Sequence, residues 1–119
     1  MKNYVIAMLA LMLTSSMFSQ SEEDYENTLK LIQKSFNENN SSLIHEKFES
    51  NLKATLEKVN LEKMIDSLHK EKGSMNSYEF IMEEENEKNY LVDFEYASML
   101  IVLHLTPDGE ISTFKITEY

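Results

Sequence analysis

The chain has 119 residues, with one Pro, two Gly and no Cys or Trp, and all 11 of its basic residues are Lys. Its 21 acidic residues give a formal net charge of −10 at pH 7. Nucleic acids and anionic membrane surfaces are bound through patches of Lys and Arg, so this acidic balance argues against both as partners. Without Cys the chain forms no disulfide, and its length suits a single domain.

The first 21 residues have the features of a secretory signal peptide. A single Lys2 precedes an apolar run at 4–13, and small and polar residues follow before the first acids. About ten apolar residues are too few to cross a bilayer core of ~30 Å. The sequence therefore predicts a signal peptide at 1–21 and one exported domain at 22–119, periplasmic or secreted, without a stable membrane anchor.

Three helices are predicted in the first half of this domain. Apolar residues recur at the helical spacing of three and four in three successive segments. An Asn- and Ser-rich stretch at 37–42 ends the first segment, the pattern resets near residue 58, and Gly73 can end the third. Ser41 or Ser42 is expected to cap the second helix and Asn60 the third. The inward positions are Tyr25, Leu29, Ile32 and Phe36, then Leu43, Ile44, Phe48 and Leu52, then Leu61, Met64, Ile65 and Leu68.

Beyond Gly73 the apolar period changes to two, which is typical of strands. Two amphipathic strands are predicted around 78–83 and 90–95, and the acidic run between them predicts a solvated hairpin tip. The segment 99–105 is apolar on both faces, as interior strands usually are. The turn Thr106-Pro107-Asp108-Gly109 then predicts a three-residue hairpin with a bulge, leading into the last strand.

The last hairpin also predicts a register, because a pairing across the turn fixes every later pair. The predicted pairs are Leu105 with Ile111, His104 with Ser112, Val102 with Phe114, Leu100 with Ile116, Phe94 with Leu100, Val92 with Val102 and Tyr90 with His104. On this register the helices cover the face that carries Tyr78, Phe80, Tyr90, Val92, Phe94, Val102, Phe114 and Ile116. The predicted fold class is α+β, with three N-terminal helices packed on a four-stranded antiparallel meander sheet.

Three runs of the chain carry a resemblance to a known family: FNENNSSLIHEKFESNLKATLEKVNLEKMIDSL, GSMNSYEFI and LIVLHLTPDGEISTFKI. Together they resemble the small exported NTF2-like, cystatin-like-fold domains of unknown function, some of which stand alone and some of which precede serine-hydrolase domains. The resemblance covers nearly all of residues 22–119 and rests on pattern rather than on catalytic residues. It implies an α+β cone with a pocket between helices and sheet that serves as a binding or accessory module.

A ligand pocket is predicted inside this cone, at Tyr78, Tyr90, His104 and Ser112. On the predicted register His104 lies inside, next to Ser112 and opposite Tyr90. A buried imidazole with a phenol and a hydroxyl could orient a ligand or serve acid–base chemistry. A histidine that is hydrogen-bonded for structural reasons is the alternative interpretation.

A protein interface is predicted on the opposite sheet face. That face would carry a contiguous apolar patch formed by Leu91, Met99, Ile101, Leu103, Leu105 and Ile111. Monomers seldom expose a large apolar patch, so a homodimer or an unknown protein partner is expected to cover it. The alternative is that strand twist and the long stems of Lys and Glu cover much of it.

No metal site or cofactor is predicted, because the three histidines lack zinc-binding spacing and the acids at 83–87 lack a calcium-loop pattern. The sequence therefore predicts an exported, non-enzymatic binding or protein-interaction module of unknown ligand. The alternative function is a small NTF2-like enzyme of the isomerase or lyase type that uses His104 and Tyr90 in the cone.

Overall fold

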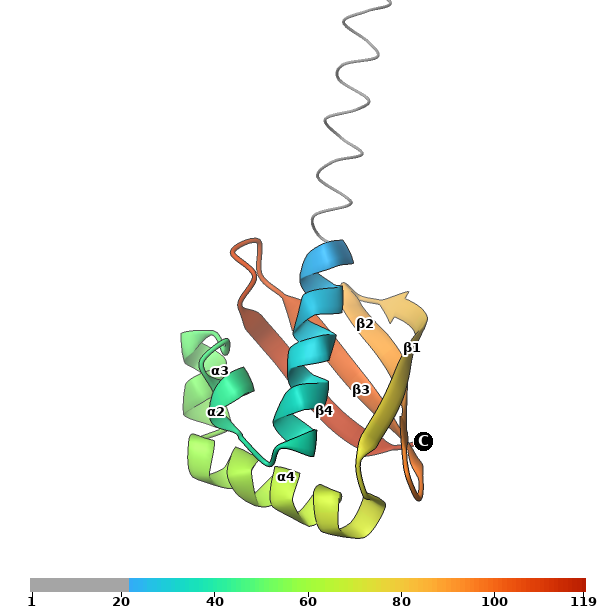
Figure 1. Cartoon of the computed structure of the whole chain (residues 1–119). Helices are drawn as coiled ribbons and strands as arrows, with labels where there is room; N and C mark the ends of the chain where they lie inside the picture. The colour runs from blue at the N-terminus through green and yellow to red at the C-terminus, as the bar shows by residue number, and fades with distance from the viewer. Residues whose placement is uncertain (1–21) are drawn as a thin grey trace, which may run out of the picture.

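The computed structural model describes residues 22–119, and the predicted signal peptide at 1–21 lies outside the described residues. The fold is α+β, as predicted: helices come first and pack on a four-stranded antiparallel sheet of order β1-β2-β3-β4 (Figure 1). After the N-terminal helix at 22–37, the elements are α2 (Ser42–His45), α3 (Ser50–Thr55), α4 (Lys58–Lys72), β1 (Met75–Glu84), β2 (Glu87–Phe94), β3 (Ser98–Leu105) and β4 (Ile111–Glu118).

The N-terminal helix lies across the front of the sheet, and α4 closes its lower end (Figure 1). The predicted apolar stripe of the N-terminal helix is buried against the strands: Tyr25, Leu29, Ile32 and Phe36. The inward residues of the later helices complete the core. Ile44, Phe48, Leu61 and Ile65 are fully buried, and Leu52, Met64 and Leu68 pack against them.

The predicted second helix is interrupted, which the helical pattern did not indicate. Residues 47–49 leave the helix and pair with the start of β4: Glu49 N–H donates to Ile111 O at 2.8 Å, and Ile111 N–H donates to Lys47 O at 2.7 Å. The burial of Phe48 fits a helix or a bridge equally well, so its place in an apolar stripe was not decisive. The predicted cap at Asn60 is also wrong, because α4 begins at Lys58 with Glu57 at the N-cap.

The register of β3 differs from the predicted one on both sides. On the β2 side, Phe94 N–H donates to Ala97 O at 2.8 Å and closes a tight turn. Tyr90 therefore faces Ile101 instead of His104, a shift of an odd number of residues that exchanges the two faces of β3. On the β4 side, the Leu105 to Ile111 pair is confirmed, but a bulge then sets Phe114 opposite Leu103.

As a result, the sheet face beneath the helices carries the other half of β3. Met99, Ile101, Leu103 and Leu105 are buried there, together with Tyr90, Val92, Phe94, Ile111 and Phe114. The opposite face carries Leu91, Leu100 and Val102, all partly exposed. Most inward positions predicted for the other strands are confirmed, so the error in face is confined to β3 and to the first residues of β4.

The carboxylate of Glu95 joins the end of α4 to the turn between β2 and β3. Its Oε1 accepts a hydrogen bond from Ser74 N–H at 2.9 Å, while its own N–H donates to Ser74 O at 3.0 Å. Gly73, at the end of α4, has φ +83° and ψ −156°, a conformation that is essentially open to Gly alone. A Cβ at Gly73 would lie 2.8 Å from the Cβ of Glu95.

Gly73→Ala should therefore destabilise the domain more than Gly109→Ala. The two glycines have nearly the same φ, +83° and +84°, but a Cβ at Gly109 meets nothing within 4 Å. Positive φ alone costs an L-residue about 1 kcal/mol, so Gly109→Ala measures that cost and Gly73→Ala should exceed it clearly. Urea unfolding of residues 22–119 checks this, and equal losses would show that the approach of Glu95 has no energetic weight.

Candidate functional site

The four residues of the predicted pocket do not converge. Tyr90 is 5% exposed and lies on the helix-covered face, where Tyr78 also packs against the core. His104 pairs with Thr113 on the opposite face, and Ser112 lies in the bulge, where its Oγ donates to His104 O at 3.2 Å. The prediction that His104 faces Tyr90 is wrong, because the odd register shift places the two side chains on opposite sides of the sheet.

His104 has a structural contact instead. Its Nδ1 lies 2.6 Å from Asn86 O, in the turn between β1 and β2. A carbonyl only accepts, so Nδ1 carries a proton in this bond. Glu85 and Asn86 both have positive φ, 51° and 67°, which is unusual for Glu. His104 therefore fastens a two-residue turn that the sequence alone would hold poorly.

The residues of the predicted interface are mostly in the core. Met99, Ile101, Leu103, Leu105 and Ile111 lie beneath the helices, each no more than 6% exposed. Only Leu91 lies on the uncovered face, opposite Leu100 and Glu79. A dimer through the buried residues would require the helices to leave the sheet.

The corner between the N-terminal helix and β1 holds a cluster of aromatic residues. Tyr25 Oη accepts a hydrogen bond from Leu105 N–H at 3.0 Å, and Tyr78 Oη donates to Glu26 Oε1 at 2.9 Å. Phe80 lies against Tyr90 with their ring centres 5.7 Å apart. The bond of Tyr78 therefore joins the N-terminal helix to β1, and the bond of Tyr25 joins it to β3.

Tyr78 and Tyr90 in this corner have raised pKa values, because both are buried at least in part and lie near carboxylates. Desolvation, and then the hydrogen bond to Glu26, raise the pKa of Tyr78 to about 12. Desolvation raises the pKa of Tyr90 too, and negative charge nearby, including that of Glu83, adds to the effect. The corner therefore disfavours a further negative charge.

The helical half of the chain contacts the two edge strands, β1 and β4, in different ways. At the β4 edge, the bridge from residues 47–49 covers Ile111, and α2 and α3 lie beside the strand (Figure 1). At the β1 edge, only the first two residues are covered: Gln33 Nε2 donates to Asn76 O at 3.3 Å, and the other bonds reach Met75. Asn37 Oδ1 accepts from Met75 N–H at 2.7 Å, Asn37 Nδ2 donates to Met75 O at 3.0 Å, and Gln33 Nε2 adds a bond to the same carbonyl at 3.1 Å.

Residues 77–84 of β1 leave an open strand edge, which is called the β1 edge below. Within the described part of the chain, the backbone of this segment pairs with β2 and with no other element. Unpaired N–H and C=O groups along a strand edge are a template for another strand. An added strand would therefore meet no obstacle from the described backbone at the β1 edge.

Three consecutive apolar side chains occupy the β1 edge. Phe80, Ile81 and Met82 are 53%, 42% and 46% exposed. A bulge at Ile81 interrupts the pairing with β2, so Phe80 faces Tyr90 on the helix side, whereas Met82 faces Asn89 on the other side. These three residues, the apolar triplet, thus wrap around the edge. Sequence reasoning placed them in a strand, but its prediction that the helices cover Phe80 is wrong, because Phe80 lies at the open edge.

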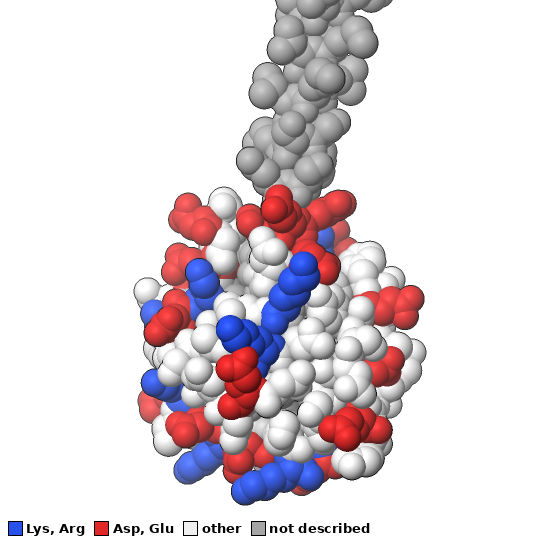
Figure 2. Space-filling model, viewed as in Figure 1, with Lys and Arg blue, Asp and Glu red and all other residues white. Residues whose placement is uncertain are grey.

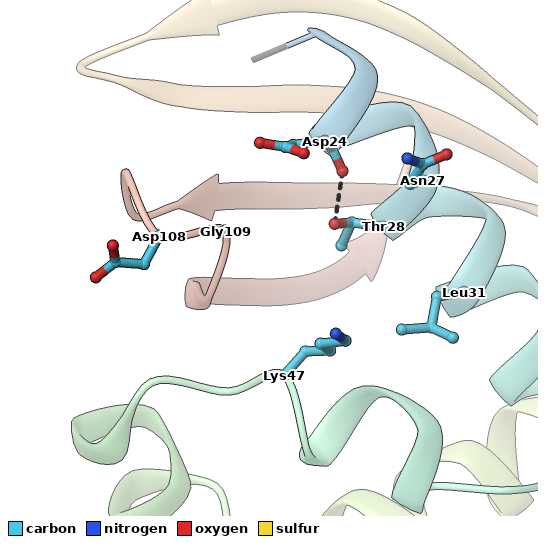
Figure 3. A pocket seen from close by; sticks show the side chains of 7 residues that line it. All are labelled: Asp24, Asn27, Thr28, Leu31, Lys47, Asp108 and Gly109. Carbon is cyan, nitrogen blue, oxygen red and sulfur yellow. Dashed lines mark hydrogen bonds between the residues drawn. The ribbon is translucent and has the colours of Figure 1, made fainter. Parts of the chain in front are cut away.

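A separate hollow lies between the N-terminal helix and the β3–β4 hairpin. It has a volume of about 280 Å³ and is lined by Asp24, Asn27, Thr28, Leu31, Lys47, Asp108 and Gly109 (Figure 3). Lys47 extends toward the helix, whereas the carboxylate of Asp108 points away from the hollow (Figure 3). Most of these side chains are exposed, and the hydroxyl of Thr28 is bonded within its own helix to Asp24 O. The polar groups do not converge on one point.

Two further absences apply to residues 22–119. No group of three or more His, Cys, Asp or Glu side chains is arranged to hold a metal ion in this range. Over the same residues, no helix has the length and apolar character that crossing a membrane requires.

Asn37→Ala should loosen the covered end of β1. The change removes two hydrogen bonds to the Met75 backbone, each worth about 1 kcal/mol net, and Gln33 still holds the carbonyl. We expect a loss of about 1–2 kcal/mol in urea unfolding and faster amide exchange at Met75. Asn37→Asp keeps the acceptor for Met75 N–H and should lose less. Equal stability of wild type and Asn37→Ala would show that the hydrogen bonds of Asn37 to Met75 do not stabilise this end of β1.

Tyr78→Phe should change the alkaline stability of the domain. The folded pKa of Tyr78, about 12, lies above its ordinary value of 10.0, so its contribution is complete below pH 10 and is lost as the pH rises toward 12. Over that window the wild type should lose more stability than Tyr78→Phe, as measured by thermal unfolding. Tyr119→Phe, at a 76% exposed tyrosine, is the control. Parallel curves for wild type and Tyr78→Phe would contradict the assignment.

Comparison of the chain with protein-family models, with curated proteins and with solved structures finds no match.

Proposed function

We propose that the mature domain is an exported, non-enzymatic protein-interaction module, and that it binds through the β1 edge. One observation carries this proposal: the sheet edge at residues 77–84 is open and carries an exposed apolar triplet, whereas the β4 edge is paired at Ile111 and has α2 and α3 beside it (Figure 1). An extended segment of another polypeptide would add to β1 as a fifth strand. Main-chain hydrogen bonds give affinity in this mode of recognition, and side chains on the two faces give specificity.

The contacts that surround the edge support a binding role. The hydrogen bonds of Asn37 to the Met75 backbone and of His104 to Asn86 hold both ends of β1 in place. A partner would therefore meet a preformed strand, which lowers the entropy cost of binding. The apolar triplet offers hydrophobic contact on both sides of that strand.

One feature of the sequence and one of the fold complete the proposal. The N-terminal 21 residues support export, and the helices packed on one face of an antiparallel meander are the layers that the NTF2-like resemblance implies. We propose on that ground that the domain is of the NTF2-like, cystatin-like type. The separation of His104 from Tyr90 favours a binding role over the isomerase or lyase alternative.

A selection from a library of displayed random linear peptides tests this function. Peptides selected on residues 22–119 should bind a variant carrying Ile81→Ser and Met82→Ser at least about tenfold more weakly, because the variant loses apolar contact at the edge. Val59→Ser is the matched control, since Val59 is an exposed apolar residue (52%) on α4, away from the edge. The bound peptides should also slow amide exchange at 77–84.

Three results would contradict the proposal: no peptide is enriched, the selected peptides bind the double variant as well as the wild type, or they protect amides outside β1. Unfolding curves of the variants serve as the check on folding. Because both substituted side chains are more than 40% exposed, the variant is expected to fold.

A further inference from the structure

We infer that the partner segment at the β1 edge is basic and apolar, with Lys or Arg as well as aliphatic side chains on each of its two faces, and that a second copy of this chain is excluded there. This inference rests on the proposed function of the same edge and adds the chemistry of the partner. It follows from the charges that surround the apolar triplet.

The β1 edge and the turn that follows it carry glutamates that form no salt bridge within the described residues. Five glutamates lie between Lys72 and Lys88, and no basic residue is among them: Glu79, Glu83, Glu84, Glu85 and Glu87. In the described part of the molecule the ion pairs are Lys70 with Asp66 and Lys72 with Glu118, so none of these five glutamates has a salt-bridge partner there. Figure 2 shows acidic side chains separated by uncharged ones on the right-hand margin, where β1 lies, whereas lysines gather at the centre and the left.

The ammonium group of Lys88 lies over aromatic rings. The backbone of Lys88 is opposite that of Glu83 in the hairpin, whereas its Nζ lies 4.3 Å from the centre of the Tyr25 ring and 5.9 Å from that of Phe80. A cation over an aromatic face is attracted by the ring. Lys88 thus shows how a basic side chain is received in this corner, and the exposed part of the Phe80 ring offers a similar contact to a basic side chain of a partner.

Both faces of the added strand would meet an apolar group and a carboxylate. On the helix side the neighbours are Phe80 and Glu83, which share that face with Tyr90 and Lys88. On the other side they are Met82 and Glu84, in line with Asn89 and Glu87. A segment that combines aliphatic with basic side chains satisfies both surfaces, and an acidic segment would place like charges together.

The same charges argue against a second copy of the chain. A two-fold axis at Ile81 would pair two β1 strands antiparallel with Glu79 opposite Glu83, and symmetry would repeat that contact. Like charges directly opposite each other destabilise a strand pair, and a net charge of −10 adds long-range repulsion. Charged side chains on an edge strand are a known device against such self-pairing.

Three synthetic peptides as long as the open edge test the inference, each repeating two Val and then two Lys, two Gln or two Glu, so that both faces of the added strand carry both kinds of side chain. They are titrated into residues 22–119 at low ionic strength, and binding is followed by amide chemical shifts. The Lys peptide should bind about tenfold more tightly than the Gln peptide, with the largest shifts at 77–84, since several exposed ion pairs contribute. The Glu peptide should bind most weakly. The Lys preference should shrink as added salt shortens the screening length.

Charge variants of the domain give the matched control. Glu83→Gln with Glu84→Gln should weaken the Lys peptide several-fold and leave the Gln peptide unchanged. Glu62→Gln with Glu71→Gln removes the same charge from exposed positions on α4 and should change neither affinity.

The outcomes separate this inference from the proposed function. Equal binding of the Lys and Gln peptides at 77–84 overturns the basic preference and leaves strand addition at β1 standing. Shifts that fall outside β1 with the Lys peptide, or no binding of that peptide at all, also overturn the inference, while the selected random peptides test strand addition by themselves. A dimer that protects 77–84 without any peptide overturns the exclusion of a second copy.

Discussion

The structure depends on which face of β3 the helices cover. Both sides of this strand carry apolar residues, but Met99, Ile101, Leu103 and Leu105 form a larger set than Leu100 and Val102, so hydrophobic burial favours the face that the helices cover. The two neighbouring connections set the registers that place this face beneath the helices. The tight turn from Phe94 to Ala97 sets the register with β2, and the bulge at Ser112 brings Ile111 and Phe114 to the same face. The N-terminal helix can then bury its whole stripe, and its Tyr25 hydroxyl reaches the backbone of Leu105.

This choice also determines which surfaces remain for function. Because the larger apolar set lies in the core, the uncovered sheet face is only modestly apolar. The helical half of the chain pairs with the β4 edge at Ile111 through residues 47–49 and reaches the backbone of β1 only at Met75 and Asn76. The exposed apolar side chains of the sheet are therefore concentrated at the β1 edge, in Phe80, Ile81 and Met82. Position in the sheet, rather than composition, makes this segment a candidate for binding.

Much of the fold follows from local pattern in the sequence. The helical stripes, the four strands, the hairpin with Gly109 and the inward positions of β1, β2 and most of β4 were predicted, because period and turn chemistry are local properties. The face of β3 was not, since Leu100 and Val102 on the second face weaken the periodic signal that Ser98 and His104 provide. The bulge at Ser112 and the turn at Ala97 involve no Gly, so nothing in the sequence marked the odd shifts that they introduce. The break at 47–49 was hidden because Phe48 is buried in either conformation.

The candidate site was harder to predict than the fold. The pocket at His104 and Tyr90 and the patch at Leu103 both depended on the register of β3, and one shift displaced both. The β1 edge depended on a different kind of information, namely how far the helices reach across the sheet. Its local signal was the apolar triplet followed by glutamates, which conflicts with simple alternation.

Residue-resolved amide hydrogen exchange of residues 22–119 would test the central claim most directly. A sheet covered on the Leu103 face, paired at its β4 edge only at Ile111 and open at β1, predicts the slowest exchange in β2 and β3. In 77–84 it predicts that slow amides bonded to β2 alternate with fast amides at the open edge. Uniformly slow exchange along 77–84 would show that this edge is already covered, and fast exchange throughout β3 would contradict the core placed beneath the helices.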